Sequence, residues 1–286
     1  MKKVGVVGCG TMGTGITQVC AQSGYQVVVS EINDELLNKG LVFINSYLTR
    51  SANKGRMTQQ EKDSTLARIK GTTNIKDFSD RDMIIEATIE NLDLKKKIFA
   101  ELDKVCPKQA ILASNTSCLS IIDMAVMTSR PEKVLGLHFF NPVQTMKLLE
   151  IVKTVATSDE TLETGKNFGK SIDKTTVIAK DTPGFLANRL GIVFLLEAIR
   201  MLEAGIGTRE DIDTTIKLGY NHPMGPLTLT DLIGLDVALH IANSIYEETK
   251  DPKFASPILL KKMVAVGWLG RKTGKGFYEY GSQSSN

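Results

Sequence analysis

The sequence predicts an α/β protein in which a mostly parallel sheet flanked by helices, over residues 1–182, precedes an all-helical domain over residues 183–286. In the first half, short apolar runs alternate with stretches of helical periodicity, which is the pattern of β-α-β units. After Asp181-Thr182-Pro183-Gly184 the pattern is helical only. A length of 286 residues also fits about two domains.

The elements of the first domain follow from the changes of period along the chain. An apolar run at 4–8 and a β-branched run within 26–30 predict two strands. The helical spacing of 11–23 lies between them and ends at Gly24, which suits a helix C-terminus. A long helix is expected from Asn33 or Asp34. Further buried strands are expected at 83–85, 111–113 and 134–137, with helices at about 92–105 and 119–127.

The second domain begins with a helix signal. Thr182 suits the N-cap and Pro183 the first helical position. Because the apolar run Ile192-Val193-Phe194-Leu195-Leu196 is wide for one small domain, we expect a buried subunit interface in this half. Helices are expected at 183–204, 208–218, 226–249 and 255–266.

Composition and charge exclude several classes of protein. The formal net charge of +3 is close to neutral, which argues against a dedicated nucleic-acid-binding protein. No apolar run approaches the ~20 residues that span a bilayer, and no secretory signal is recognised, so neither a membrane partner nor export is expected. Three scattered histidines predict no metal site. The four cysteines form no C-x-x-C pair and are interpreted as reduced packing residues, which predicts a cytoplasmic location: Cys9, Cys20, Cys106 and Cys118.

A glycine-rich segment directly follows the first strand. Gly8-Cys9-Gly10-Thr11-Met12-Gly13 is a G-x-G-x-x-G that opens the first helix, where the backbone can approach a pyrophosphate and the helix offers N–H groups. An acidic residue should follow about 20 residues later, and Glu31 stands at the end of the second strand. Its carboxylate can accept both ribose hydroxyls and would repel a 2′-phosphate. The first domain is therefore predicted to be a Rossmann-type domain that prefers NAD over NADP. The alternative interpretation of Glu31 is an ordinary acidic residue at a helix start.

Residues 36–60 contain no acidic side chain but four basic ones, Lys39, Arg50, Lys54 and Arg56. Arg50 and Lys54 are four residues apart and so share one helix face. This one-sided run suggests a polyanionic ligand. A solvated helix end is the alternative.

A histidine and a glutamate lie on two apolar runs that a hairpin would join. His138 and Glu150 are equidistant from Gln144, so in a hairpin centred there the two positions face each other. A buried carboxylate needs a partner, and it would orient the imidazole and stabilise its protonated form. This is the arrangement that a general acid–base catalyst needs. A structural His–Glu pair in the core is the alternative.

Further motifs occur in a fixed order with the glycine loop: Ser114-Asn115-Thr116-Ser117, His138-Phe139-Phe140-Asn141-Pro142, Asp181-Thr182-Pro183-Gly184-Phe185-x-x-Asn188-Arg189, His222-Pro223-Met224-Gly225-Pro226 and Gly270-Arg271-Lys272-Thr273-Gly274-Lys275-Gly276-Phe277-Tyr278. From about Lys3 to Tyr280 the chain resembles the 3-hydroxyacyl-CoA dehydrogenase family. It departs at Glu31, where many members carry Asp, but the carboxylate is kept.

The resemblance implies reversible, NAD-dependent oxidation of (S)-3-hydroxybutanoyl-CoA to acetoacetyl-CoA by a homodimer formed through the helical domain, with no hydratase domain attached. It also implies residue roles. His138 matches the acid–base residue and Glu150 its partner, while Ser117 and Asn188 match residues around the substrate's oxygen. Arg50 is added to the coenzyme A site from the charge argument. The remaining implied contacts are Lys54 for coenzyme A, and Glu90, Lys95, Ser117, Asn141 and Lys272 for the cofactor, beside Gly8, Gly10, Thr11, Met12, Gly13 and Glu31.

Two other interpretations stay open. Another two-domain NAD-dependent hydroxy-acid dehydrogenase would share the glycine loop but would not need the basic run or the paired His138 and Glu150. A non-catalytic dinucleotide-binding relative would not need the acid–base residues at all.

Overall fold

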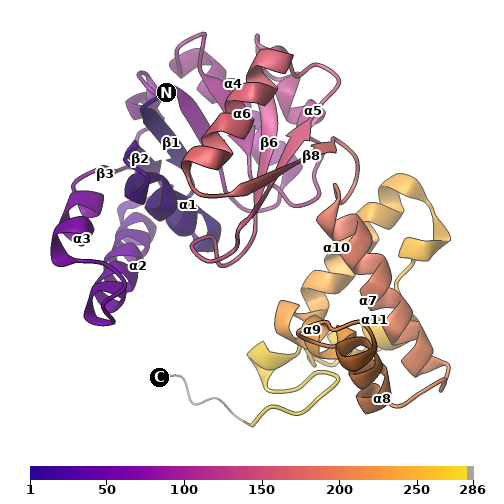
Figure 1. Cartoon of the computed structure of the whole chain (residues 1–286). Coiled ribbons are helices and arrows are strands. Elements are labelled where there is room, and N and C mark those ends of the chain that lie inside the picture. Colours follow the sequence, from indigo (N-terminus) through magenta and orange to yellow (C-terminus); the bar gives the residue numbers. More distant parts are fainter. Residues whose placement is uncertain (282–286) are drawn as a thin grey trace. The chain divides into compact units, whose positions relative to one another are not determined.

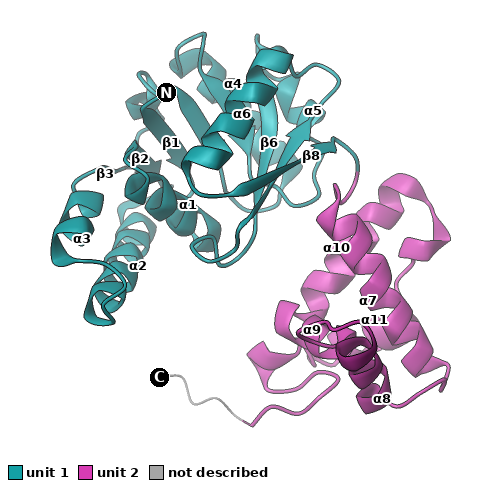
Figure 2. Cartoon of the chain, viewed as in Figure 1, with its two compact units in different colours: residues 1–182 teal, residues 183–286 magenta. Residues whose placement is uncertain are grey.

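The computed structural model describes residues 1–281, in two compact units that divide between Thr182 and Pro183 (Figure 2). None of the helices within these residues is long and apolar enough to cross a bilayer.

The first unit is built on one sheet, in which the described residues form eight strands in the order β3-β2-β1-β4-β5-β6-β7-β8 (Figure 1). Neighbouring strands are parallel except β6 and β7, which pair antiparallel, so the sheet is mostly parallel as predicted. The strands are β1 (Lys3–Val7), β2 (Gln26–Ser30), β3 (Ile69–Thr72), β4 (Met83–Glu86), β5 (Ile111–Ser114), β6 (Val134–Phe139), β7 (Leu148–Lys153) and β8 (Thr175–Lys180).

Helices cover both faces of this sheet. The helices of the first unit are α1 (Thr11–Gln22), α2 (Asp34–Asn53), α3 (Gln59–Leu66), α4 (Leu92–Val105), α5 (Ile121–Ala125) and α6 (Asp159–Ser171), with 3-10 turns at Ile75–Phe78 and Pro131–Lys133. In Figure 1, α1 and α6 lie in front of the sheet and α4 and α5 behind it. Ile16 of α1 and Phe168 of α6 belong to one apolar core with alternate residues of the strands, such as Val4, Val6 and Leu137.

The local signals agree with most of these elements. The helix that starts near Asn33 is α2, and the Asn33 side chain accepts the backbone N–H of Leu36 as its cap. Sequence analysis assigned no elements to α3, α6, β3 or β8. β3 has the sequence Ile-Lys-Gly-Thr, in which Lys70 and Gly71 interrupt any β-branched run. At Gly71 a Cβ would lie 2.9 Å from a methyl group of Leu41, so the Leu41 side chain would have to shift to admit a larger residue.

The second unit is helical, as predicted. Its helices are α7 (Ala187–Glu203), α8 (Arg209–Thr214), α9 (Pro226–Ile233), α10 (Leu235–Thr249) and α11 (Ile258–Ala265), with a π-turn at Thr215–Gly219 and 3-10 turns at Pro252–Phe254 and Arg271–Thr273. They surround a separate core that includes Leu196, Leu227, Leu235, Ile245 and Phe254. The apolar run of α7 contributes Ile192, Leu195 and Leu196 to the buried residues of this unit.

Two helix boundaries differ from the prediction. The first helix does not begin at Thr182 and Pro183 but at Ala187, because Gly184 and Phe185 have φ values of +77° and +46°, outside the right-handed helical region. The helix predicted over 226–249 is two helices. Gly234, with φ of +106°, ends α9 and begins α10.

Candidate active site

The glycine loop joins β1 to α1 at the point where the strand order changes direction, between β1 and β4. Gly8 has φ of +100°, and a Cβ on Gly13 would lie 1.9 Å from the carbonyl oxygen of Gly8, so both positions need glycine. Gly10 is the N-cap of α1, and no described side chain caps this helix. The first backbone N–H groups of α1 therefore point to a site suited to a phosphate, as in other open α/β sheets.

Glu31 follows β2 directly, beside the glycine loop. Its Oε2 accepts the backbone N–H of Cys9 at 2.9 Å, and its Oε1 accepts that of Ile32 at 2.8 Å. Burial, aided by the charge of Glu31, raises the pKa of the Cys9 thiol to about 12, so this thiol stays neutral. The pyrophosphate cradle and the carboxylate thus lie together, and this donor set fits the phosphates and a ribose of a dinucleotide.

The basic run is divided along α2. Arg50 lies in the last turn of this helix and Lys54 is its C-cap residue, whose N–H donates to the Arg50 carbonyl at 3.2 Å. Both side chains and Arg56 are exposed. Lys39 lies eleven residues before Arg50, hence about 16 Å away along the helix. Arg50, Lys54 and Arg56 therefore form a basic patch at one end of α2, and Lys39 is not part of it.

His138 and Glu150 are paired across β6 and β7. The antiparallel register places His138 opposite Glu150, and the Nδ1 of His138 lies 2.6 Å from Oε2 of Glu150, which confirms the predicted pairing of these positions. The histidine is 5% exposed and the glutamate 0%. Neighbouring Leu137 and Phe139 point into the core under α1 and α6, so by strand alternation His138 lies on the opposite face.

This geometry has a chemical consequence. Glu150 occupies the Nδ1 side of the imidazole, so proton exchange with a substrate would use Nε2. The carboxylate fixes the ring and stabilises a positive charge on it, which is what a proton-transferring histidine requires.

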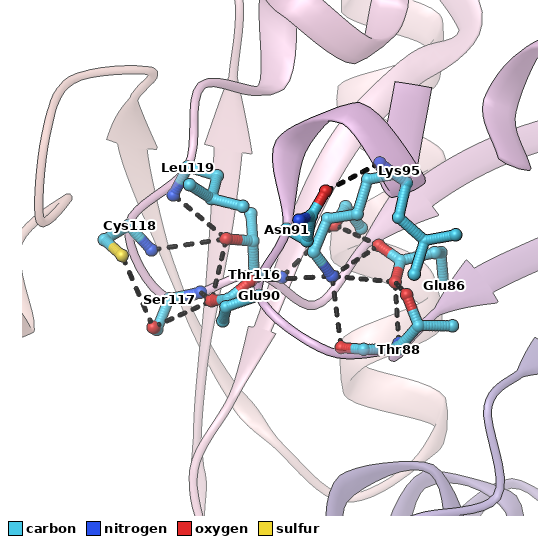
Figure 3. Close-up of polar contacts among 11 residues, drawn as sticks. Glu86, Thr88, Glu90, Asn91, Lys95, Thr116, Ser117, Cys118 and Leu119 are labelled. Atoms are coloured by element: carbon cyan, nitrogen blue, oxygen red, sulfur yellow. Dashed lines mark hydrogen bonds and ion pairs between the residues drawn. The ribbon is translucent and has the colours of Figure 1, made fainter. Parts of the chain in front are cut away.

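A second polar cluster lies where β4 and β5 end, next to the start of α4 (Figure 3). Glu90 accepts hydrogen bonds from the hydroxyl of Thr116 and from both the backbone N–H and the hydroxyl of Ser117. Lys95 donates to Glu86 and lies 3.5 Å from Glu90. Ser117, Glu90 and Lys95, which the family resemblance brought forward separately, are thus in one network.

Lys95 is the first of three successive lysines, Lys95-Lys96-Lys97, a run that would ordinarily be solvated, but it is buried. Its side chain is 1% exposed, because it lies on the face of α4 that also buries Phe99 and Leu102. That i, i+4, i+7 spacing was the signal that could have identified it. Sequence analysis also missed Glu86, whose signal was a carboxylate at the end of the apolar run Met83-Ile84-Ile85.

The other expected site residues are placed as follows. Asn141 is exposed two residues after the end of β6, near His138 in sequence. Asn188 lies in the first turn of α7, in the second unit. Lys272, in the 3-10 turn after α11, is exposed and forms a 2.6 Å ion pair with Asp236. Residues 1–281 contain no cluster of three or more side chains able to hold a metal ion.

The sheet with its glycine loop and acidic residue defines the nucleotide-binding domain of a dehydrogenase, here followed by a helical domain. Two family models match the chain: that of the 3-hydroxyacyl-CoA dehydrogenase NAD binding domain over residues 3–182, and that of the 3-hydroxyacyl-CoA dehydrogenase C-terminal domain over residues 184–280. The chain belongs to the 3-hydroxyacyl-CoA dehydrogenase family. It is an oxidoreductase, and its cofactor is NAD.

Similar proteins support this assignment over the whole length. The 3-hydroxybutyryl-CoA dehydrogenase of Clostridioides difficile is 45% identical over 278 residues, which cover 97% of this chain and 99% of that protein. The crystal structure of (S)-3-hydroxybutyryl-CoA dehydrogenase from Ralstonia eutropha has a TM-score of 0.96 at 44% identity, with 99% of this chain and 100% of that chain covered. Pig mitochondrial hydroxyacyl-coenzyme A dehydrogenase is 41% identical, covering 98% of this chain and 91% of that protein.

Proposed function

We propose that this chain catalyses the reversible oxidation of (S)-3-hydroxybutanoyl-CoA to acetoacetyl-CoA, with His138 as the general acid–base residue and Glu150 as its partner. The observation that carries the proposal is the buried 2.6 Å contact between the two side chains. The substrate is proposed from the names of two similar proteins, the 3-hydroxybutyryl-CoA dehydrogenases of Clostridioides difficile and Ralstonia eutropha.

The mechanism follows from what each side chain can do. Bound NAD supplies the hydride acceptor at its nicotinamide ring. In the oxidation, neutral His138 takes the proton of the C3 hydroxyl through Nε2, and Glu150 stabilises the imidazolium that forms. In the reduction, His138 returns that proton to the same oxygen. Ser117 and Asn188 are proposed to hold this oxygen where charge develops on it.

The cofactor and coenzyme A contacts are proposed from the positions of the glycine loop, Glu31 and the basic patch. Gly8, Gly10, Thr11, Met12 and Gly13 would hold the pyrophosphate through the start of α1. Glu31 would hold a ribose, which favours NAD over NADP. The basic patch with Arg50 and Lys54 would bind the phosphates of coenzyme A. The further proposed cofactor contacts are Glu90, Ser117, Asn141 and Lys272. Lys95, whose side chain is 1% exposed, would act on the cofactor site through its ion pair with Glu90.

We also propose a cytoplasmic homodimer formed through the second unit. The second unit has an apolar cavity of about 330 Å³ at its surface, lined by residues such as Phe194, Met201 and Ile216, which a partner subunit could cover. All four cysteines are buried thiols, as suits a reducing compartment. Sedimentation equilibrium at several concentrations measures the mass, and a monomer throughout would refute the dimer.

The activity is tested by following NADH absorbance with acetoacetyl-CoA as substrate. Free acetoacetate should react poorly, because it lacks the binding energy of the coenzyme A moiety. Equal rates with both would favour a hydroxy-acid dehydrogenase instead. His138→Gln should lower kcat by about 10²–10⁴-fold while NADH binding is kept. An active variant would remove His138 from the mechanism.

A further inference from the structure

Glu86 is a buried carboxylate that the proposed mechanism does not use. It ends β4, between Val7 of β1 and Ser114 of β5, and is 0% exposed. It accepts five hydrogen bonds: from the N–H and hydroxyl of Thr88, twice from Lys95, and from the hydroxyl of Ser114. Five donors on one carboxylate indicate a residue held in one fixed position.

Lys95 is the cation that matches this carboxylate. Its Nζ lies 2.7 and 2.9 Å from the two carboxylate oxygens of Glu86, 3.3 Å from the carbonyl oxygen of Thr88 and 3.5 Å from Oε2 of Glu90. An ammonium has three N–H groups, and here they all point to protein oxygens. With its side chain 1% exposed, Lys95 has little surface for a ligand in this conformation.

Glu90 contacts both Lys95 and Ser117 and so links the two residues. Its Oε2 faces Lys95, while its Oε1 accepts the Ser117 N–H at 2.7 Å, the Ser117 hydroxyl at 3.0 Å and the Thr116 hydroxyl at 2.9 Å (Figure 3). A line of alternating charges therefore runs from Glu86 through Lys95 and Glu90 to the serine. Each charge is balanced by its neighbours, so the place of Glu90 depends on how Lys95 is shared between two carboxylates.

We propose that Glu86 is a positioning residue of the dehydrogenase: through the buried Lys95 it sets Glu90, and Glu90 sets the backbone and hydroxyl of Ser117. The proposal rests on the role proposed above for Ser117. Without the charge of Glu86, the ammonium has one carboxylate left and draws Glu90 toward itself. Glu90 then loses its contacts to Ser117, and the serine no longer holds the substrate's oxygen in place.

The test compares Glu86→Gln with Asp103→Asn in the full-length protein. Asp103 lies on α4, the helix that carries Lys95, and forms a 2.7 Å ion pair with buried Arg130. Its other partners, Ser129 and Lys108, lie outside the network around Ser117. The two variants thus each remove one carboxylate that pairs with a buried cation beside α4. For both we would measure the thermal midpoint, kcat, and KM for acetoacetyl-CoA and NADH.

Glu86→Gln should lower kcat by about 10–10²-fold, the loss typical of a displacement near 1 Å at a reacting group, and change the KM of acetoacetyl-CoA less than about threefold. The KM of NADH should rise, because the displaced Glu90 is also a proposed cofactor contact. Asp103→Asn should lower the thermal midpoint comparably and keep kcat within about twofold. An unchanged kcat in Glu86→Gln, or an equal fall of kcat in both variants, would overturn the proposal. If Glu86→Gln does not fold, Glu86→Asp, which keeps the charge but is one methylene shorter, should show a smaller fall in kcat of the same kind.

A second readout separates this proposal from the proposed function. Crystal structures of the wild-type and Glu86→Gln proteins measure the distance from Ser117 Oγ to the Glu90 carboxylate. It should open beyond 3.5 Å in the variant, and an unchanged distance would overturn the positioning role whatever the activity. A wild-type protein that does not turn over acetoacetyl-CoA would refute the proposed function alone.

Discussion

Replacing Glu150 by glutamine tests the acid–base pair with the least change of shape. Glutamine fills the same volume and can still accept a hydrogen bond from His138, but it carries no charge. With the contact at 2.6 Å, the centres of the two charged groups lie about 4 Å apart. At an effective dielectric constant of about 20 their attraction is about 4 kcal/mol. If that attraction is present only once the imidazole is protonated, its loss raises the barrier to proton transfer by up to this amount, or about 10³-fold in kcat.

The assay is the steady-state oxidation of NADH with acetoacetyl-CoA at saturating concentrations. We expect Glu150→Gln to lower kcat by about 10²–10³-fold, because the amide keeps part of the interaction, with the KM of NADH unchanged. Glu160→Gln is the matched control, since Glu160 is exposed in the first turn of α6 and contacts neither site residue. Circular dichroism should show both variants folded.

The result that refutes the reasoning is a folded Glu150→Gln protein that keeps kcat within about threefold of the wild type. The carboxylate would then not stabilise a developing charge, and the pair would be a structural contact in the core. A loss of kcat matched by an equal loss in Glu160→Gln would also remove the argument.

The cofactor loop, the basic patch and the end of β8 provide the remaining tests. Glu31→Ala should lower the affinity for NAD by about 10–100-fold in binding titrations, as expected for the loss of a hydrogen bond to a charged group. An equal loss of affinity for NADP would reject the ribose assignment. Arg50→Ala and Lys54→Ala should each raise the KM of acetoacetyl-CoA about two- to fivefold but leave the KM of a pantetheine-truncated thioester unchanged, and Lys104→Ala is the control. An equal loss of activity with both substrates would indicate a folding defect instead. Burial raises the pKa of Asp181 above its usual value of 3.8, although it accepts two backbone N–H groups of α5. Its contribution to stability is therefore complete below pH 3.8 and lost as the pH rises through the folded-state pKa. The urea midpoint of the wild type relative to that of Asp181→Asn should therefore fall as the pH rises above 3.8, and a rising difference would contradict this.

Local patterns predicted the features whose signal lies within a few residues. The glycine loop was predictable because Gly8 and Gly13 are required by backbone geometry at single positions. The pairing of His138 with Glu150 was predictable because both residues lie in apolar runs joined by a short connection, and a slip of one residue would turn every side chain of a strand to the other face. By contrast, the start of α7 was wrong by four residues, since Gly184 and Phe185 adopt left-handed conformations that a Thr-Pro signal does not reveal.

The network around Ser117 could not be predicted from local sequence patterns. It joins the ends of two strands to the first turn of a helix, and three of its hydrogen-bonded pairs are 9, 27 and 28 residues apart in the chain. The sequence contains every charged residue of the network, but from three successive lysines it cannot be predicted which side chain is buried. That is decided when α4 packs on the sheet and carries Lys95 inside beside Glu86.

The sequence alone predicted the fold class, the dinucleotide loop and the pairing of His138 with Glu150, because these depend on periodicity, on glycine and on the register of a hairpin. Only the tertiary structure decided which carboxylates and cations share a buried site. The physical reason is that burial and charge pairing arise from contacts between elements distant in the chain, and each pairing takes effect only once water has been excluded from both partners.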